Sequence, residues 1–269
     1  MIYETISFSI DNHVALVKLN RPEKANALNA AAWKELKSIF EELDENKEVR
    51  VIVLSGSGKH FCSGIDVSLL ADLLKSEDSI DARQSEKIRK LILELQSSVT
   101  AIELCSKPVI AAIKGGCIGA GVDIICACDM RYATQDAFFT IKEIDMGMVA
   151  DLGTLQRLPK LIPEGFAREM AFTGREVFGA EAERIGLVNK CYETVDMLFS
   201  SVTEIADTIA SKSPVSIRGT KHILNHSRDH SVTDGLQYMA TWNAAMLISE
   251  DFKEVFKAKT EKRLPDFKN

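Results

Sequence analysis

The stretch from Pro108 to Asp123 reads PVIAAIKGGCIGAGVD, an apolar run followed by a glycine-rich run. Pro108 to Ile113 carries the apolar and β-branched residues expected of a strand that is buried on both faces. Gly115 to Gly121 breaks this pattern and opens a helix at about Gly119. The stretch therefore predicts a strand, a turn and a helix in succession, which is typical of an α/β protein.

Similar patterns extend outward in both directions. Val49 to Leu54 predicts a second buried strand, and the turn Ser55-Gly56-Ser57-Gly58 ends it. The other predicted elements are a hairpin (Ile2 to Ile10 and Val14 to Leu19), a helix from Asn29 to about Glu45, a long helix from about Arg83 to Leu104, and short strands between Met130 and Ile141. Beyond about Pro163 we expect mostly helix, with one short strand at Leu187 to Tyr192 and a helical block from Pro214 to about Lys262.

Composition excludes several classes of protein. The chain has 269 residues, 46% of them hydrophobic, and a net charge of −6, which argues against a nucleic-acid-binding surface. The basic cluster Arg83, Lys87, Arg89 and Lys90 is interleaved with acids and predicts a solvated helix face. No apolar run approaches the roughly 18 residues of a membrane helix. Six scattered cysteines without a C-x-x-C pair indicate a reducing compartment.

Neither end of the chain is expected to carry a targeting signal. The N-terminus begins with the alternating segment from Ile2, which leaves no room for a signal peptide. The last residues do not form the peroxisomal Ser-Lys-Leu address. On these grounds we expect a cytoplasmic location.

Three acidic residues stand in otherwise apolar stretches: Asp123, Glu143 and Asp151. A carboxyl group that loses hydration has a raised pKa, and it can then exchange protons near neutral pH. The pattern therefore favours proton-transfer chemistry. For any one of the three taken alone, a structural role remains open, such as capping a helix or pairing with Arg131 or Arg157.

The glycine runs do not match nucleotide-binding loops. Gly58-Lys59 is followed by His60, which does not fit the Walker A pattern, and Gly115 to Gly121 contains no G-x-G-x-x-G. Small residues at the start of a helix can still present free N–H groups to negative charge. Ser63-Gly64-Ile65-Asp66 offers a second set of such groups, and the two sets could converge on a thioester enolate. Tight turns that simply need glycine are the alternative for each run.

Taken in order, these segments resemble the crotonase (enoyl-CoA hydratase/isomerase) superfamily over essentially the whole chain. The segments that carry the resemblance are NRPEKANAL from Asn20, FCSGID from Phe61, KPVIAA from Lys107 through Asp123, LQRLP from Leu155, and FTG from Phe172. Asp123, Glu143 and Asp151, with YMATWN from Tyr238, are most similar to the Δ3,5-Δ2,4-dienoyl-CoA isomerase branch. Hydratases usually have a glycine at the position of Asp151. Ala120 stands where the family often has glycine.

The resemblance implies a fold and a division of the chain. The fold would be α/β, a crotonase-like repeated ββα spiral with a helical C-terminal oligomerisation region. Residues 1–200 would form the core that binds acyl-CoA and performs catalysis. Residues 201–269 would form a helical trimerisation region, and the trimers would often pair into hexamers. The substrate would be an acyl-CoA thioester, with no further cofactor, metal, nucleic acid or membrane partner.

The resemblance also implies a mechanism for fatty acid β-oxidation. The N–H groups of Ile65 and Ala120 would hold the thioester oxygen, Asp151 would remove the C2 proton, Glu143 would protonate C6, and Asp123 would tune or orient the pair. The residues expected to bind substrate and CoA are Lys24, Ala25, Ser63, Gly64, Ile65, Asp66, Val67 and Ala120. Lys257 and Lys262 are candidates for contacts with the CoA phosphates.

Other functions stay open at this level. The nearest is a 2-enoyl-CoA hydratase that uses Asp123 and Glu143 around a water molecule. RNA binding through the basic cluster and a non-catalytic acyl-CoA-binding scaffold are more distant alternatives. His222, His226 and His230 have a helical spacing that could hold a transition metal, although a solvated polar face explains the same spacing.

Overall fold

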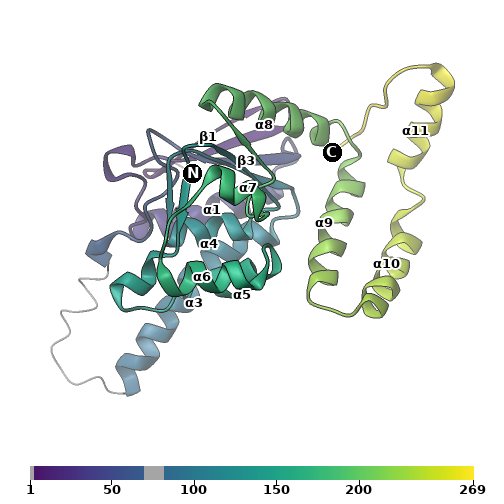
Figure 1. Ribbon diagram of the computed structural model, residues 1–269. Coiled ribbons are helices and arrows are strands. Elements are labelled where there is room, and N and C mark those ends of the chain that lie inside the picture. The colour runs from purple at the N-terminus through teal and green to yellow at the C-terminus, as the bar shows by residue number, and fades with distance from the viewer. Residues whose placement is uncertain (1–2, 70–81) are drawn as a thin grey trace.

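The computed structural model describes residues 3–69 and 82–269 as one α/β body with a helical extension (Figure 1). The main sheet has six strands in the order β1-β2-β3-β4-β6-β9. These strands are β1 (Ile6–Asp11), β2 (Val14–Leu19), β3 (Val51–Gly56), β4 (Val109–Ile113), β6 (Met130–Thr134) and β9 (Lys190–Tyr192). β1 and β2 form the predicted antiparallel hairpin, and all later neighbours pair in parallel.

A second, smaller sheet has the order β5-β7-β8, formed by β5 (Gly116–Ile118), β7 (Phe138–Thr140) and β8 (Val177–Phe178). The sequence pattern did not predict β5 or β8. Both are very short, and β5 lies inside the glycine run, so their strand conformation comes from pairing with β7 rather than from local preference.

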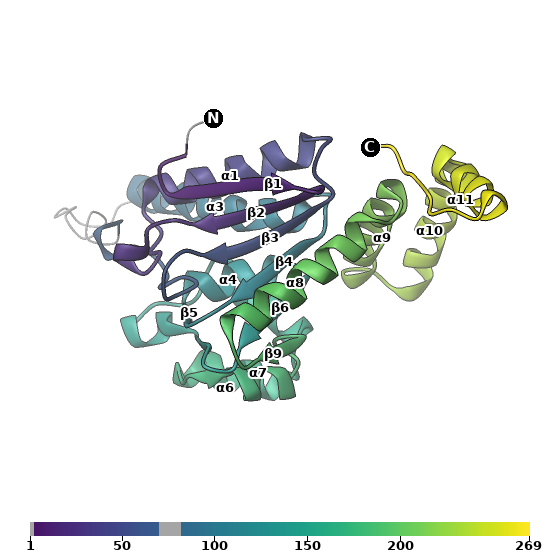
Figure 2. The same cartoon turned by 90° about the horizontal axis from the view of Figure 1, so that it is seen from above.

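Helices cover both faces of the main sheet (Figure 2). α1 (Ala30–Glu45) and α3 (Ala82–Leu104) pack on one face, and α8 (Val195–Ala210) packs on the other. The sequence of β3 is continuously apolar because both of its faces are buried. Ile52 and Leu54 belong to the core on the side of α1 and α3, whereas Val51 and Val53 belong to the core on the side of α8. A strand buried on both faces needs no polar alternation.

The remaining helices place the loops of the sheet and form the C-terminal third. They are α4 (Ala120–Ala127), α5 (Thr154–Arg157), α6 (Glu164–Thr173), α7 (Gly179–Arg184), α9 (Pro214–Arg228), α10 (Val232–Met246) and α11 (Glu250–Glu261). The described residues also form 3-10 helices: η1 (Pro22–Lys24) before α1, η2 (Lys142–Met146) after β7, and η3 (Leu158–Lys160) after α5. The predicted α/β fold with a helical C-terminal third is confirmed.

The C-terminal helices α9, α10 and α11 stand away from the sheet (Figures 1 and 2). α9 is tied to the core through Lys221, a buried residue whose Nζ lies 2.8 Å from Oδ2 of Asp129. α8 runs through residue 200 and packs on the sheet, so the part that projects from the core begins after Ala210. Within the described residues, no helix has the length and apolar character needed to cross a bilayer.

Candidate active site

Two loops that are far apart in the sequence are joined by an isolated parallel β-bridge between Cys62 and Cys117. The N–H of Cys62 donates to the carbonyl oxygen of Gly116 at 3.1 Å, and the N–H of Ile118 donates to that of Cys62 at 2.9 Å. The loop after β3 is therefore fixed next to the glycine run that opens α4. This contact brings the two predicted sets of N–H groups into one place.

The N–H of Ile65 points away from its own bridge partner. Ile65 forms a parallel bridge with Leu28 through its neighbours: the carbonyl of Gly64 accepts from Leu28, and the N–H of Asp66 donates to Leu28. In such a bridge the N–H of the central residue faces the opposite side. A Cβ on Gly64, whose φ is +96°, would lie 3.7 Å from the nitrogen of Ala120.

Ala120 is the first residue of α4, where a helix leaves its N–H groups without internal partners. Neither the N–H of Ala120 nor that of Ile65 donates a hydrogen bond to any described residue. Two neighbouring, unpaired N–H groups from separate loops have the geometry of a site for developing negative charge. This supports the predicted pairing of Ile65 and Ala120.

Asp123 lies in the first turn of α4 and is 1% exposed. Its Oδ1 accepts two hydrogen bonds from Thr154, from the backbone N–H and from Oγ1, each at 2.6 Å. Within residues 3–69 and 82–269, its Oδ2 has no hydrogen-bond partner. Burial raises the pKa of Asp123 to about 6, although the bonds from Thr154 oppose the rise.

Glu143 lies in η2, directly after β7, and its carboxyl group reaches back toward the start of α4. The N–H of Gly119 donates to the carbonyl of Thr140 at 2.9 Å, which holds the two segments together. Oε2 of Glu143 is buried and has no partner among the described residues. Burial, and then the negative charges of Asp123 and Asp151, raise the pKa of Glu143 to about 7. The charges of the three carboxyl groups thus influence one another.

Asp151 differs from the other two acids because it is exposed. Its apolar neighbours Ala150 and Leu152 are buried, whereas Asp151 itself is exposed. The apolar sequence around Asp151 therefore did not translate into a buried side chain. Partial loss of hydration still raises the pKa of its carboxyl group. The carbonyl of Asp151 accepts from Nε2 of Gln96 at 2.6 Å, which anchors the backbone at this point.

The structural alternatives for the three acids were capping a helix or pairing with Arg131 or Arg157. Asp123 does accept from the N–H of Thr154, the first residue of α5. Arg131 instead donates to the backbone carbonyls of Leu187 and Cys128 at 2.8 Å each. Arg157 forms a salt bridge with Glu103 at 2.7 Å. Among the described residues, no arginine is hydrogen-bonded to Asp123, Glu143 or Asp151, so the three carboxyl groups are not neutralised in ion pairs.

Most of the residues predicted to bind CoA lie on two segments joined by hydrogen bonds, Lys24 to Ala25 and Ser63 to Val67. The N–H of Ser63 donates to the carbonyl of Ala25 at 3.0 Å, and its hydroxyl donates to that of Lys24 at 3.3 Å. Val67 is 66% exposed. Asp66 forms a salt bridge with Arg21 at 2.9 Å, so its carboxylate holds the loop rather than presenting a free charge.

The predicted metal alternative finds no support in the geometry of the three histidines. The rings of His226 and His230 stack with centroids 3.8 Å apart, and His226 also packs on Tyr238. No group of three or more histidine, cysteine or acidic residues within the described part of the chain could hold a metal ion.

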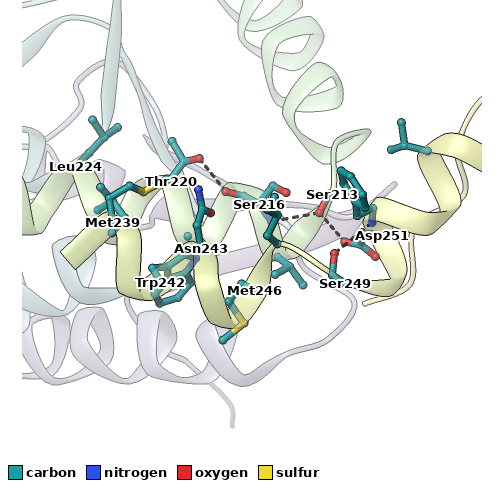
Figure 3. A pocket seen from close by; sticks show the side chains of 16 residues that line it. Ser213, Ser216, Thr220, Leu224, Met239, Trp242, Asn243, Met246, Ser249 and Asp251 are labelled. Atoms are coloured by element: carbon teal, nitrogen blue, oxygen red, sulfur yellow. Dashed lines mark hydrogen bonds between the residues drawn. The ribbon is translucent and has the colours of Figure 1, made fainter. Parts of the chain in front are cut away.

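A groove of about 340 Å³ lies between α9 and the pair α10 and α11 (Figure 3). Met239, Trp242 and Met246 line it with apolar surface, and Ser213 donates to Asp251 at one end at 2.5 Å. None of the residues predicted for catalysis or CoA binding lines this groove. It belongs to the C-terminal helices and is separate from the three acids.

Two unpaired N–H groups and three carboxyl groups with raised pKa values are features expected of an enzyme that moves protons next to an activated carbonyl group. The model for the family described as enoyl-CoA hydratase/isomerase matches residues 9–269. The chain belongs to this family.

Two curated relatives have a more specific name. The chain is 48% identical to the peroxisomal Δ3,5-Δ2,4-dienoyl-CoA isomerase of Arabidopsis thaliana, over 98% of this chain and 96% of that protein. It is 47% identical to the mitochondrial Δ3,5-Δ2,4-dienoyl-CoA isomerase of Mus musculus, over 97% of this chain and 81% of that protein. A solved structure of an enoyl-CoA hydratase from Bacillus anthracis is also similar, with a TM-score of 0.89, 32% identity and coverage of 98% and 99% of the two chains.

The names of these relatives overturn the predicted cytoplasmic location, because one is named peroxisomal and the other mitochondrial. Targeting depends on short addresses that receptors read and that the fold does not constrain. The absence of one such address therefore does not assign a compartment.

The residues that position the acids were not predicted from the sequence. Thr154 supplies both hydrogen bonds to Asp123, and Gly119 makes room for Glu143. The signal for Thr154 was its place after Gly153, where a glycine precedes a hydroxyl residue at the start of a short helix.

Proposed function

We propose that this chain converts 3,5-dienoyl-CoA thioesters into 2,4-dienoyl-CoA thioesters, a double-bond isomerisation in fatty acid β-oxidation. The observation that carries the proposal is a third carboxyl group, that of Asp151, whose charge acts on both Asp123 and Glu143. Moving a diene requires removal of a proton at one end and delivery at the other, for which two separated carboxyl groups suffice. The relatives named for this reaction support the same assignment.

In the proposed reaction the thioester oxygen accepts hydrogen bonds from the N–H groups of Ile65 and Ala120. Ionised Asp151 removes the C2 proton, and the negative charge spreads through the conjugated dienolate to C6. Protonated Glu143 then delivers its proton to C6. One proton leaves the substrate and one enters it, so the product is an isomer of the substrate.

The environments of the two carboxyl groups suit these opposite roles. Glu143 has a pKa of about 7 and thus holds a proton at neutral pH in a large fraction of molecules. Asp151 is exposed, and after each turnover it can release its proton to water while Glu143 takes one up from water. The charge of Asp123 raises the pKa of Glu143 more than that of Asp151 does, so we assign to Asp123 the role of keeping that pKa high.

We further propose that CoA lies over the loops formed by Lys24 and Ala25 and by Ser63 to Val67. Ser63 donates hydrogen bonds to the carbonyls of both Lys24 and Ala25, and these bonds support the proposal because they hold the two loops together. CoA is part of the substrate, and the proposed steps use only carboxyl groups and backbone N–H groups. They call for no additional cofactor.

Hydration of a 2-enoyl-CoA is the second candidate. It is favoured by the buried and unpaired oxygens Oδ2 of Asp123 and Oε2 of Glu143, between which a water molecule could be held. A curated relative with 32% identity, from Clostridium acetobutylicum, is named short-chain-enoyl-CoA hydratase.

An assay with 3,5-dienoyl-CoA and crotonyl-CoA side by side separates the two reactions. We expect the first substrate to give a conjugated 2,4-diene, with a rise in ultraviolet absorbance, and the second to remain largely unchanged. Efficient hydration of crotonyl-CoA without isomerisation would refute the proposal. Full recovery of both substrates after long incubation would favour the non-catalytic scaffold.

RNA binding has no support in the basic cluster of α3. Its residues are exposed and interleaved with acids, and Lys90 lies 3.9 Å from Glu86 in the same helix. A solvated helix face accounts for this pattern. We therefore propose no nucleic-acid partner.

We also propose that the chain assembles into trimers, which can pair into hexamers, through residues 201–269. Support comes from exposed apolar side chains on α9 and α10, including Leu224 at 65% and Leu236 at 65%, and from the groove in Figure 3. Soluble proteins rarely leave such surface uncovered. Sedimentation analysis tests this, since a monomer at micromolar concentration would contradict it.

A further inference from the structure

The guanidinium group of Arg157 lies directly against the backbone of Gly153. A Cβ at Gly153 would stand 1.9 Å from Nη1 of Arg157, and the φ of Gly153 is +128°, a conformation that side-chain-bearing residues rarely adopt. The backbone N–H of Arg157 donates to the carbonyl of Gly153 at 2.9 Å. The turn that begins α5 is thus held from two sides by the same residue.

Glu103 at the end of α3 holds the Arg157 side chain. Its Oε2 accepts from Nη2 of Arg157 at 2.7 Å and from Nε at 3.1 Å. The two side chains are only 14% and 12% exposed, in contrast to most surface ion pairs. Burial acts to raise the pKa of Glu103, but the hydrogen bonds from Arg157 and Arg228 hold it below its ordinary value. The pair is therefore ionised and geometrically fixed.

Arg228 of α9 bonds to the other oxygen of Glu103, and it connects the C-terminal helices to this network. A polar cavity of about 370 Å³ runs beside the network and is lined by Gln96, Leu152 and Gly153, among others. Gln96 is the residue that anchors the backbone of Asp151. The backbone of the segment from Asp151 to Thr154 is therefore held at two points, by Gln96 at Asp151 and by Arg157 at Gly153.

The consequence for the site passes through Thr154. This residue follows Gly153 directly and supplies both hydrogen bonds that Asp123 accepts. We propose that Arg157 is a positioning residue for the isomerisation: it fixes the Gly153-Thr154 turn against Asp123, and Glu103 holds Arg157 in place. This inference rests on the proposed function for its catalytic readout.

The charge of Arg157 provides a second, measurable effect. Burial raises the pKa of Asp123, whereas the hydrogen bonds from Thr154 and the positive charge of Arg157 lower it. Removal of that charge therefore raises the pKa of Asp123 further. A purely structural role of Arg157 in packing would not predict such a change.

The test compares Arg157→Met, Arg157→Lys and Glu103→Gln with the unaltered protein. We expect Arg157→Met to lower kcat by about 10- to 100-fold, because the Gly153-Thr154 turn and Asp123 shift. KM for 3,5-dienoyl-CoA should change by less than about threefold, because the loops proposed to bind CoA are unaltered. Arg157→Lys keeps a positive charge and should restore part of the loss. Glu103→Gln should act in the same direction as Arg157→Met but more weakly.

A carbon-13 titration of the aspartate carboxyl groups measures the effect on Asp123 without any turnover, and Asp123→Asn identifies its signal. The pKa of Asp123 should rise in Arg157→Met and rise less in Arg157→Lys. Arg168→Met is the matched control, since Arg168 pairs with Glu164 on the exposed face of α6 and should leave kcat and the titration unchanged.

An unchanged kcat and an unchanged Asp123 titration in folded Arg157→Met would overturn the inference. So would a loss of thermal stability with no change in the titration, equal in the Met and Lys variants. If Arg157→Met does not fold, Glu103→Gln decides by the same two measurements. If the unaltered protein does not isomerise dienoyl-CoA, the proposed function fails, and the carbon-13 titration still decides the role of Arg157.

Discussion

The carboxyl group of Glu143 lies against the backbone of Gly119, so that a Cβ on this glycine would stand 3.1 Å from Oε1 of Glu143. Gly119 has a φ of +52° and precedes Ala120, whose N–H is unpaired among the described residues. A single residue without a side chain thus turns the chain into α4 and leaves space for the acid. The N–H of Ala120 and the carboxyl group of Glu143 are therefore positioned by the same residue, Gly119.

Gly119→Ala should therefore reduce both stability and activity. The unfavourable φ should lower the free energy of unfolding by about 1–3 kcal/mol, and displacement of the Glu143 carboxyl group should lower kcat by about 10-fold or more. Urea unfolding and steady-state kinetics measure the two effects. Gly165→Ala in α6 is the control: no atom lies within 4 Å of its Cβ, and it should leave stability equal or higher by about 0.5–1 kcal/mol. Equal behaviour of the two variants would contradict the role of Gly119.

Asp151→Asn should abolish isomerisation while it leaves ligand binding largely intact. An amide cannot accept the C2 proton, and loss of a general base typically lowers kcat by about 100- to 10,000-fold. Calorimetric titration with 2,4-dienoyl-CoA should still show binding. Asp136→Asn, at another exposed aspartate, serves as the control and should keep normal turnover. Near-normal turnover of Asp151→Asn would remove Asp151 from the mechanism.

The dependence of kcat on pH should have a descending limb on the alkaline side near pH 7. Burial raises the pKa of Glu143 to about 7, and the proposed reaction needs its protonated form. The raised pKa of Asp151, which must be ionised, should produce the ascending limb at lower pH. A pH–rate profile in buffers of constant ionic strength tests this, and a kcat that stays level from pH 6 to pH 9 would exclude Glu143 as the acid.

Stability should also depend on pH through Glu143. Its pKa in the folded protein, about 7, exceeds the ordinary value of 4.5, so the folded state binds more protons between these values. This contribution is fully present below about pH 4.5 and is lost as the pH rises through 7. From pH 5 to pH 8 the free energy of unfolding of the unaltered protein should fall by about 1–3 kcal/mol relative to that of Glu143→Gln. Glu176→Gln, at an exposed glutamate, should not change the pH dependence; parallel curves for the unaltered protein and Glu143→Gln would contradict the assignment.

Asn26 should be a larger determinant of stability than its polarity suggests. It is 1% exposed, and its Nδ2 lies within hydrogen-bond distance of the carbonyls of Ser57, His60 and Phe61. Asn26→Ala leaves these buried carbonyl groups unpaired and should lower the free energy of unfolding by about 1–3 kcal/mol. Asn12→Ala is a matched control because Asn12 also has a positive φ, of 45°, but is exposed in the hairpin turn. If the two variants lose equal stability in urea unfolding, the backbone conformation and not the hydrogen bonds explains the effect.

Much of the fold follows from local patterns. The Asn29 side chain caps α1 through the N–H of Ala32, as predicted, and the apolar runs at Val49 and Pro108 form adjacent parallel strands. Runs such as these are buried on both faces, and that requirement leaves a clear signal in the sequence. β5 and β8 left none, because a two- or three-residue strand depends on its partner in the sheet.

The sequence by itself determined the family, the order of the longer strands and helices, and three candidate acids. Only the tertiary structure decided the environments of these acids. Asp123 is buried and bonded to Thr154, 31 residues away, whereas Asp151 is exposed despite its apolar neighbours. The tertiary structure also places Glu103 against Arg157, 54 residues away. The pKa of a carboxyl group depends on burial and on charges that are close in space. Neither quantity can be read from the spacing of residues along the chain.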